Sequence, residues 1–131
     1  MRLEITRTSE LALRAFRVIA AANPRITGPR LAQTIEVSTA FLSHIVPPLV
    51  RAGWVDSKPG PDGGYRLRVP AGSVSVLAVI EAVEGPLDRE RCVLRRSPCG
   101  GQTACSLHAA WTEAREAMLG AFDAVPVVAD A

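Results

Sequence analysis

The chain has 131 residues, of which 48% are hydrophobic, and its formal net charge is +2. This length predicts one domain, or one domain with an oligomerisation arm. No apolar run approaches the roughly 18 residues that a membrane-spanning helix requires. The first residues also lack the apolar segment of a secretory signal. We therefore expect a cytosolic protein with no membrane partner.

The charge is unevenly distributed along the chain. Residues 1–70 contain ten Lys/Arg and five Asp/Glu, whereas residues 71–131 contain five and eight. A basic half is where an anionic partner would dock. The N-terminal half is therefore the candidate surface for nucleic acid.

The first part of the chain has the pattern of two helices. Apolar residues recur at helical spacing over residues 9–22, with Ser9 as the expected N-cap and Asn23-Pro24 as the stop. A second, short helix should open at Thr27-Gly28-Pro29 and run through about Thr34, because proline is favoured in a first turn.

A third helix is predicted from about Thr39 to Arg51. Ser38-Thr39 is a suitable N-cap, and Ala52-Gly53 is a natural C-terminal stop. Pro47-Pro48 interrupts this pattern, because each proline removes a hydrogen-bond donor and clashes with the preceding turn. We expect a bend near Ser43–His44 or a new helix start at Pro47.

A hairpin follows the helices. Residues 54–57 and 65–69 alternate like short strands, and Asp62-Gly63-Gly64 between them is a strong turn signal. Three helices followed by a hairpin is the order of a winged helix-turn-helix. The fold class is therefore predicted to be mainly α with a small β-hairpin wing.

The rest of the chain divides at Gly85-Pro86, which should end a helix over residues 74–84. Residues 86–102 are polar and contain Pro and Gly, which predicts a loop. A long helix is expected from about Thr103 to Ala124. The predicted organisation is a DNA-binding domain (1–85), a cluster-binding loop (86–102), a dimerisation helix (103–124) and a loose tail (125–131).

The long C-terminal helix carries an apolar stripe that so small a domain cannot easily bury, and we expect it to pack against a second copy. The stripe consists of Leu107, Trp111, Ala114, Met118, Ala121 and Phe122.

The three cysteines of the chain all fall within one short stretch, residues 92–105. In a cytosolic protein, clustered cysteines favour metal binding or redox chemistry over structural disulfides. No Cys-x-x-Cys pair typical of structural zinc is present. A Gly/Pro-rich loop can wrap thiolates around a larger centre, and iron–sulfur clusters prefer thiolate ligands. Nearby arginines should favour thiolate over thiol. The cysteines are Cys92, Cys99 and Cys105, and the arginines are Arg89, Arg91, Arg95 and Arg96.

Such a cluster usually has four protein ligands, so one is missing. His108 is one helical turn after Cys105 on the same face. Glu10, at the start of the first helix, is the alternative. Reduced thiols without a metal are the simpler interpretation of the cysteines, and an exposed helix residue is the simpler interpretation of His108.

The third helix would be the recognition helix, whose first residues meet base edges in the major groove. The alternative is an ordinary solvated helix. Basic residues of the wing and of the second helix would contact phosphate. The candidate DNA-binding residues are Ser38, Thr39, Ala40, Ser43, His44, Lys58, Arg66 and Arg30.

The chain resembles the IscR/NsrR (Rrf-type) family of bacterial winged-helix regulators. The resemblance covers nearly the whole chain. It is carried by Met1-Arg2-Leu3, Glu10-Leu11-Ala12-Leu13-Arg14, Val37-Ser38-Thr39-Ala40-Phe41-Leu42, Leu49-Val50-Arg51-Ala52-Gly53-Trp54-Val55, Gly60-Pro61-Asp62-Gly63-Gly64-Tyr65-Arg66-Leu67 and Val79-Ile80-Glu81-Ala82-Val83-Glu84-Gly85.

The resemblance implies a homodimer held by the long C-terminal helix and an iron–sulfur cluster on the three cysteines. It also implies DNA binding that changes with the state of the cluster. The segment from Cys105 to Trp111 resembles IscR-like members, in which a histidine ligates a [2Fe-2S] cluster. Glu10 matches the carboxylate that NsrR-like members present from the partner subunit to a [4Fe-4S] cluster. Both cluster types therefore stay open.

Two positions depart from the family pattern. Pro59 stands where a wing arginine is common, so Lys58 would have to replace that contact. Pro47 is unusual inside the recognition helix.

The sequence thus predicts a dimeric transcription regulator, a repressor, that binds double-stranded operator DNA and senses nitric oxide, iron or redox state. A change at the cluster would alter the angle between two recognition helices, which must lie about 34 Å apart to enter successive major grooves. The rivals are a thiol-redox or zinc-stabilised DNA-binding regulator and a helical protein–protein adaptor. An enzyme is least supported, because no nucleophile–base pattern accompanies His44 or His108, the two histidines.

Overall fold

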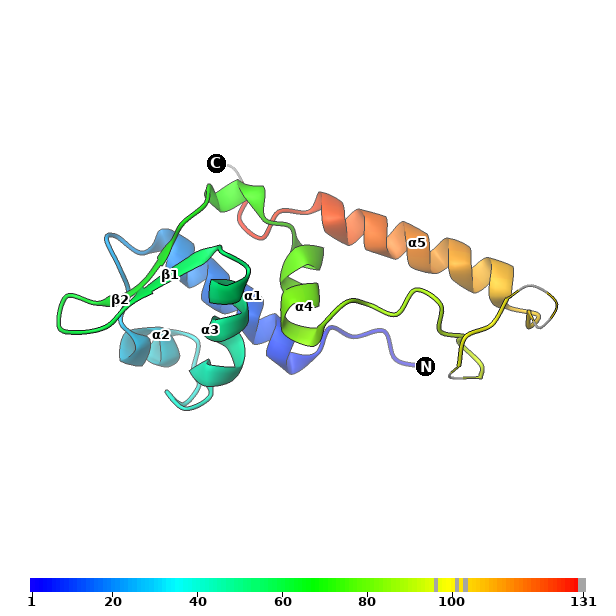
Figure 1. The fold of residues 1–131 in the computed structure, drawn as a ribbon, viewed down its shortest axis with the longest axis horizontal. Helices are drawn as coiled ribbons and strands as arrows, with labels where there is room; N and C mark the ends of the chain where they lie inside the picture. The colour runs from blue at the N-terminus through cyan, green and yellow to red at the C-terminus, as the bar shows by residue number, and fades with distance from the viewer. Residues whose placement is uncertain (96, 101, 103, 130–131) are drawn as a thin grey trace.

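The computed structural model describes residues 1–95, 97–100, 102 and 104–129 (Figure 1). The predictions made for Arg96, for Thr103 as a helix start and for the last two residues of the tail lie outside the described residues. The elements in chain order are α1 (Arg7–Ala21), α2 (Gly28–Thr34), α3 (Leu42–Arg51), β1 (Val55–Lys58), β2 (Gly64–Leu67), a 3-10 turn (Ala71–Ser73), α4 (Val76–Glu84) and α5 (His108–Ala124).

These elements confirm the predicted fold class. Three helices and an antiparallel hairpin form one half of the molecule, and α4 packs against α1, α3 and α5. Figure 1 shows α5 extending away from this half, with the chain between α4 and α5 running out to its far end. The N-terminal segment runs toward the same end.

Helix α1 begins two residues earlier than predicted. Thr6, not Ser9, is its N-cap, and the Thr6 side chain accepts a hydrogen bond from the Ser9 backbone N–H at 3.2 Å. Ser9 is fully buried and its hydroxyl donates instead to the Glu84 carboxylate at the end of α4. The prediction of Ser9 as cap was wrong because Thr6 supplies the same chemistry three positions earlier.

Helix α3 begins at Leu42 and continues through Pro47 and Pro48. The predicted new start at Pro47 is therefore wrong. The prolines are tolerated because packing holds the helix: Ile45 and Leu49 are completely buried in the core. The later start leaves Ser38 in a turn ahead of the helix, where its hydroxyl accepts the Phe41 N–H at 3.2 Å.

The core lies between α1 and its neighbours. Leu11, Phe16 and Ile19 of α1 are fully buried. The Phe16 ring meets the Trp54 ring edge-on with centroids 6.3 Å apart, and this contact joins α1 to the base of the hairpin.

The hairpin pairs Val55 with Leu67 and Lys58 with Gly64. It is held to the segment before α2 by two backbone hydrogen bonds between Tyr65 and Ile26, at 2.7 and 3.0 Å. This wing is therefore fixed relative to the helices rather than attached only through its strand ends.

The prediction of a loose tail is wrong for its first residues, because they are packed. Val127 is 3% exposed, and its backbone N–H donates to Val74 at 2.9 Å. Val76 in turn donates to the Val125 carbonyl at 2.8 Å. Apolar side chains at 127 and 128 join the core cluster, which the tail's position after the helix did not reveal.

Helix α5 leaves most of its apolar stripe uncovered within one chain. Leu107, just before the helix, is 44% exposed. Ala114 and Ala121 are exposed, and the aromatic and Met side chains are half-buried. The face that the chain does bury carries Arg115 and Leu119.

Candidate functional site

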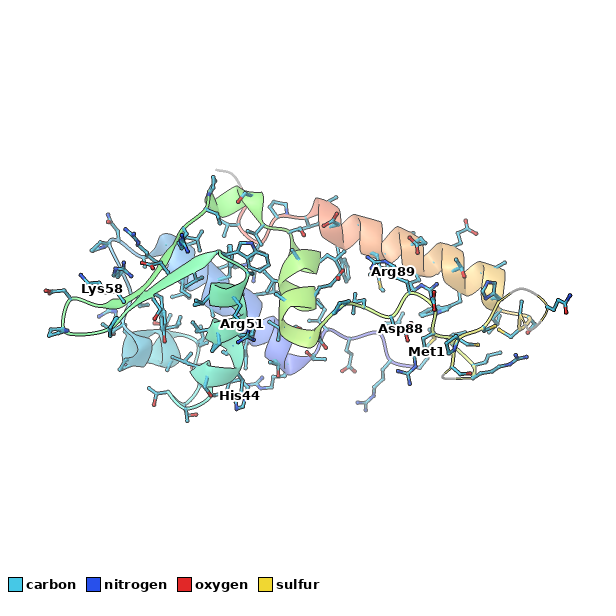
Figure 2. The ribbon with its side chains drawn as sticks, in the orientation of Figure 1. Met1, His44, Arg51, Lys58, Asp88 and Arg89 are labelled. Atoms are coloured by element: carbon cyan, nitrogen blue, oxygen red, sulfur yellow. The ribbon has the colours of Figure 1, made fainter. Side chains whose placement is uncertain are left out.

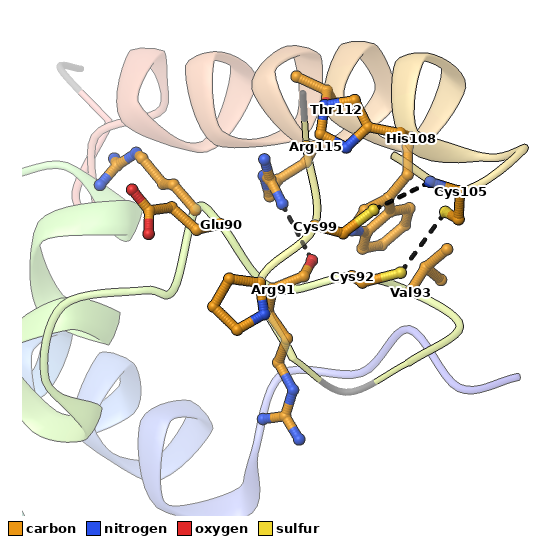
Figure 3. Close-up of a pocket in the computed structure, with 13 residues that line it drawn as sticks. Glu90, Arg91, Cys92, Val93, Cys99, Cys105, His108, Thr112 and Arg115 are labelled. Atoms are coloured by element: carbon orange, nitrogen blue, oxygen red, sulfur yellow. Dashed lines mark hydrogen bonds between the residues drawn. The ribbon is translucent and has the colours of Figure 1, made fainter. Parts of the chain in front are cut away.

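The chain between α4 and α5 brings the three cysteines together. The Sγ atoms of Cys92, Cys99 and Cys105 all lie within 4.8 Å of one another. The Cys92 and Cys105 sulfurs are 3.5 Å apart, and the Cys105 backbone N–H donates to the Cys99 sulfur at 3.1 Å (Figure 3). Residues that are 13 positions apart in sequence thus share one site.

A small turn places Cys92 at the centre of this site. The Cys92 backbone N–H donates to the Ser97 carbonyl at 2.8 Å, and Arg91 and Pro98 form an isolated bridge beside it. The turn directs the backbone N–H groups of Leu94 and Arg95 at the Cys92 sulfur, each at 3.4 Å. Cys92 is 7% exposed.

The thiols differ in acidity because of these contacts. Burial raises the pKa of Cys92, but the Arg95 and Leu94 N–H groups and the two neighbouring thiols oppose this effect and hold the pKa at about 7. Burial raises the pKa of Cys105, with further increases from Cys92 and Cys99 that outweigh the opposing Leu107 N–H. Cys92 is therefore the thiol predisposed to ionise near neutral pH.

His108 lies beside the cysteines, and Glu10 of the same chain does not. His108 is the first residue of α5 and borders, with Cys99 and Cys105, a cavity of about 380 Å³. Glu10 lies on α1, where its carboxylate accepts a hydrogen bond from Arg14 at 2.5 Å. Within one chain, the structure thus places His108, and not Glu10, beside the cysteines.

The donor set fits an iron–sulfur cluster. Three clustered sulfur atoms, with an imidazole at the edge of an adjoining cavity, are ligands of the kind that such clusters and zinc take. The cysteines themselves, and not an acidic group, supply the three atoms that lie close enough to share a metal.

Sequence reasoning missed Arg115, which is buried beside the cysteines. Its Nη1 donates to the Arg91 carbonyl at 3.3 Å. The available signal was its spacing, since it follows His108 by seven residues and so lies two turns along the same helix face. Arg89, by contrast, is half exposed and pairs with Glu81 at 3.6 Å.

The predicted DNA-binding residues lie on the half of the molecule opposite the cysteines. Figure 2 shows Lys58 on the wing and His44 and Arg51 on α3, far from Asp88 and Arg89 of the cysteine loop. Arg51, exposed in the last turn of α3, is a further cation that the candidate set did not include. All eight residues of the predicted set are exposed: Ser38, Thr39, Ala40, Ser43, His44, Arg30, Lys58 and Arg66.

Arg66 is less available than predicted, because it shares Asp56 with Arg25. The Arg66 Nε lies 3.3 Å from the Asp56 carboxylate, to which Arg25 also donates. The hydrogen bond from Arg25 is the main cause that lowers the pKa of Asp56, so this carboxylate is charged at neutral pH. Part of the Arg66 charge is therefore balanced within the wing.

Among the described helices, none combines the length and the apolar character needed to cross a membrane.

Comparison with known proteins agrees with these observations. The Rrf2 family, described as iron-dependent transcriptional regulator, matches residues 5–128. The chain is 37% identical over 84 residues to the HTH-type transcriptional regulator IscR of Klebsiella pneumoniae, covering 64% of this chain and 51% of the relative. It is 38% identical over 77 residues to IscR of Vibrio atlanticus, covering 59% and 44%. The chain thus spans about half the length of the curated relatives it matches.

Solved structures share the fold. CymR of Bacillus subtilis superposes with a TM-score of 0.76 at 24% identity, covering 96% of this chain and 94% of CymR. The T. potens IscR structure gives a TM-score of 0.66 at 17% identity, covering 95% and 83%. The relatives are described as transcriptional regulators and not as enzymes, in agreement with the sequence-based prediction. With the family match extending over nearly its whole length, the chain belongs to the Rrf2 family of transcriptional regulators.

Proposed function

We propose that the chain is a DNA-binding transcription regulator whose three cysteines hold an iron–sulfur cluster that controls its affinity for operator DNA. The observation that carries the proposal is the convergence of the Cys92, Cys99 and Cys105 sulfurs within 4.8 Å. The description of the family as iron-dependent and the names of the IscR relatives support it.

The three thiolates and His108 would hold the cluster. His108 is favoured as fourth ligand because it borders the cysteine cavity, whereas Glu10 is paired with Arg14 and would have to come from a partner subunit. When bound, the cluster supplies iron that can change oxidation state and react with oxidants or nitric oxide. By the family resemblance, His108 as fourth ligand would favour a [2Fe-2S] cluster, and Glu10 from a partner subunit would favour a [4Fe-4S] cluster.

The DNA-reading surface would be the turn before α3 and its first helical turn. Ser43 and His44 are exposed there, and Lys58 on the wing is placed to contact phosphate. A second copy would pack on the uncovered stripe of α5, so that two such surfaces meet successive major grooves. We assign this homodimer to the cytoplasm, where it would act as a repressor.

Helix α4 would connect the two halves. It contacts α1, α3 and α5, and the Ser9 hydroxyl on α1 donates to Glu84 in its last turn. The residues that follow Glu84 lead directly into the cysteine loop. How the loop is held therefore affects how α4 sits against the helices that carry the DNA-reading surface.

The test is anaerobic purification followed by visible absorption and by iron and acid-labile sulfide analysis. We expect a coloured protein with iron and sulfide, and a gel-shift affinity for operator fragments that changes when the cluster is removed. A colourless protein without iron and sulfide would refute the cluster, and equal affinity with and without it would refute the control of DNA binding.

A second candidate is a thiol-redox or zinc-stabilised regulator with the same DNA-reading surface. The 3.5 Å separation of the Cys92 and Cys105 sulfurs favours it, because thiols this close can pair when oxidised. Zinc without sulfide, or a reversible disulfide in metal-free protein that alters DNA affinity, would support this candidate over the cluster.

A further inference from the structure

Arg115 is a cation buried next to the cysteines. Arg115 is 9% exposed, and it lies on the side of α5 that faces the cysteine loop. It borders two cavities that adjoin Cys92: one shared with Cys99 and His108, and another that the N-terminal segment helps to form. Figure 3 shows its guanidinium beside the Arg91 carbonyl.

The guanidinium is poorly satisfied by the protein. Its Nη1 donates to the Arg91 carbonyl at 3.3 Å, whereas its Nε is buried without a hydrogen-bond partner among the described residues. In the described part of the chain, no carboxylate forms an ion pair with it. Because arginine stays charged in proteins, a buried guanidinium in this state calls for a nearby anion.

The anion that fits is the thiolate site itself. Two acidic residues border these cavities, and neither forms an ion pair with Arg115 in the described part of the chain. Asp88 accepts the backbone N–H groups of Glu90 and Arg91, and Glu90 is exposed. Cys92 borders both cavities with Arg115, and it directly follows the residue that Arg115 contacts. Thiolates around an iron–sulfur centre carry a net negative charge that a buried cation offsets.

We propose that Arg115 is the positioning and charge-balancing residue of the cysteine site, an inference that rests on the proposed cluster. The hydrogen bond to Arg91 fixes the backbone that presents Cys92. The positive charge favours the reduced centre, which is one unit more negative than the oxidised centre.

The test compares Arg115→Met with Arg115→Lys in the cluster-loaded protein. Arg115→Met keeps the length of the side chain but removes its charge and its donors. We expect a more negative midpoint potential, with the oxidised-to-reduced ratio at the wild-type midpoint rising about tenfold. Arg115→Lys should return the potential toward the wild-type value, yet lose iron to a chelator faster than wild type because the Arg91 contact is not restored.

Arg89→Met is the matched control. Arg89 borders the same cavity, but it is half exposed and paired with Glu81. Solvent screens its charge, so the midpoint potential should stay at the wild-type value.

The outcomes separate this inference from the function on which it rests. A wild-type protein that loads its cluster, with Arg115→Met shifting the potential no more than Arg89→Met, overturns the role of Arg115 and leaves the proposed function intact. Failure of Arg115→Lys to restore the potential overturns the charge-balancing role. Wild-type protein without iron and sulfide overturns both proposals. If circular dichroism shows that Arg115→Met is unfolded, Arg115→Gln replaces it with the same expectations.

Discussion

At the scale of single residues, the pKa values of Cys92 and Cys105 are shifted in opposite directions, although their sulfur atoms lie 3.5 Å apart. Backbone donors hold the pKa of Cys92 at about 7, whereas burial raises the pKa of Cys105. A metal ligand must be deprotonated, so binding has to release the proton that Cys105 holds. Cys92 is thus the natural first ligand to an incoming metal.

The fourth ligand can be tested by substitution. Removing the imidazole with His108→Ala should shift the visible bands of the anaerobic protein and speed iron loss by about tenfold or more, because one iron would lose a protein ligand. Glu10→Ala should have the same absorption spectrum as the wild type, since Glu10 lies on α1 and pairs with Arg14. Absorption spectra and chelator-challenge rates measure both.

The reverse pattern, with Glu10→Ala altering the spectrum and His108→Ala leaving it unchanged, would contradict the assignment of His108. It would place the partner subunit's carboxylate at the cluster instead.

Sequence spacing predicted part of this site and could not predict the rest. Three cysteines clustered in one short stretch indicated a metal, because they are all the cysteines in the chain. A preference for thiolate was expected from the nearby arginines, but the pKa of Cys92 is lowered by the backbone N–H groups of a turn, which the sequence could not reveal. Arg115 was missed because an arginine in a helix is usually solvated, and only the folded loop shows that this one is covered.

At the scale of elements, the wing depends on a glycine at position 64. Gly64 has φ +122°, and a Cβ added there would lie 2.3 Å from the Ile26 carbonyl oxygen. That carbonyl accepts the Tyr65 N–H, which holds the wing to the segment before α2. The Asp-Gly-Gly signal predicted the turn, but it did not predict this approach to a distant segment.

We expect Gly64→Ala to destabilise the protein by about 2–4 kcal/mol, because backbone strain and the clash with Ile26 act together. Gly60→Ala is the control: Gly60 also has a positive φ, but nothing lies within 4 Å of an added Cβ. It should cost about 1 kcal/mol. Denaturant unfolding followed by circular dichroism measures both, and equal losses would contradict the role of the Ile26 contact.

Elements with clear local signals were predicted best. Helix α2 begins after Thr27, as expected, and Gly85 follows α4 with φ +86°. Element starts were less predictable: α5 begins at His108, because the residues before it belong to the cysteine site. Local propensity cannot show that a tertiary site takes residues away from a helix.

At the scale of the whole molecule, the uncovered stripe on α5 is where we expect the second copy. Ala114→Glu places a charge on this stripe, and the two-fold symmetry of a dimer adds a second charge nearby. Dimer affinity should fall by about tenfold or more, and operator affinity should fall with it. Because Ala114 is exposed in one chain, the fold of the monomer should be unaffected.

Gly120→Glu is the matched control for this prediction. Gly120 lies on the opposite side of α5, and nothing is within 4 Å of an added Cβ. Sedimentation should show a dimer for this variant. A dimer that persists in Ala114→Glu at wild-type affinity would show that α5 is not the interface.

The packed tail constrains how the arm formed by α5 can move. Helices α4 and α5 are connected by the cysteine loop at one end and by the hydrogen bonds of Val74 and Val76 with the residues after α5 at the other. Because α5 is held at both ends, it cannot rotate away from α4 about one end alone. A rearrangement among the thiols can therefore reach the winged-helix half through α4, which precedes the cysteine loop, or as a tilt or a roll of α5 about the Val74–Val127 junction. Arg17 of α1 lies at that junction, because its Nε donates to the Val127 carbonyl at 3.1 Å.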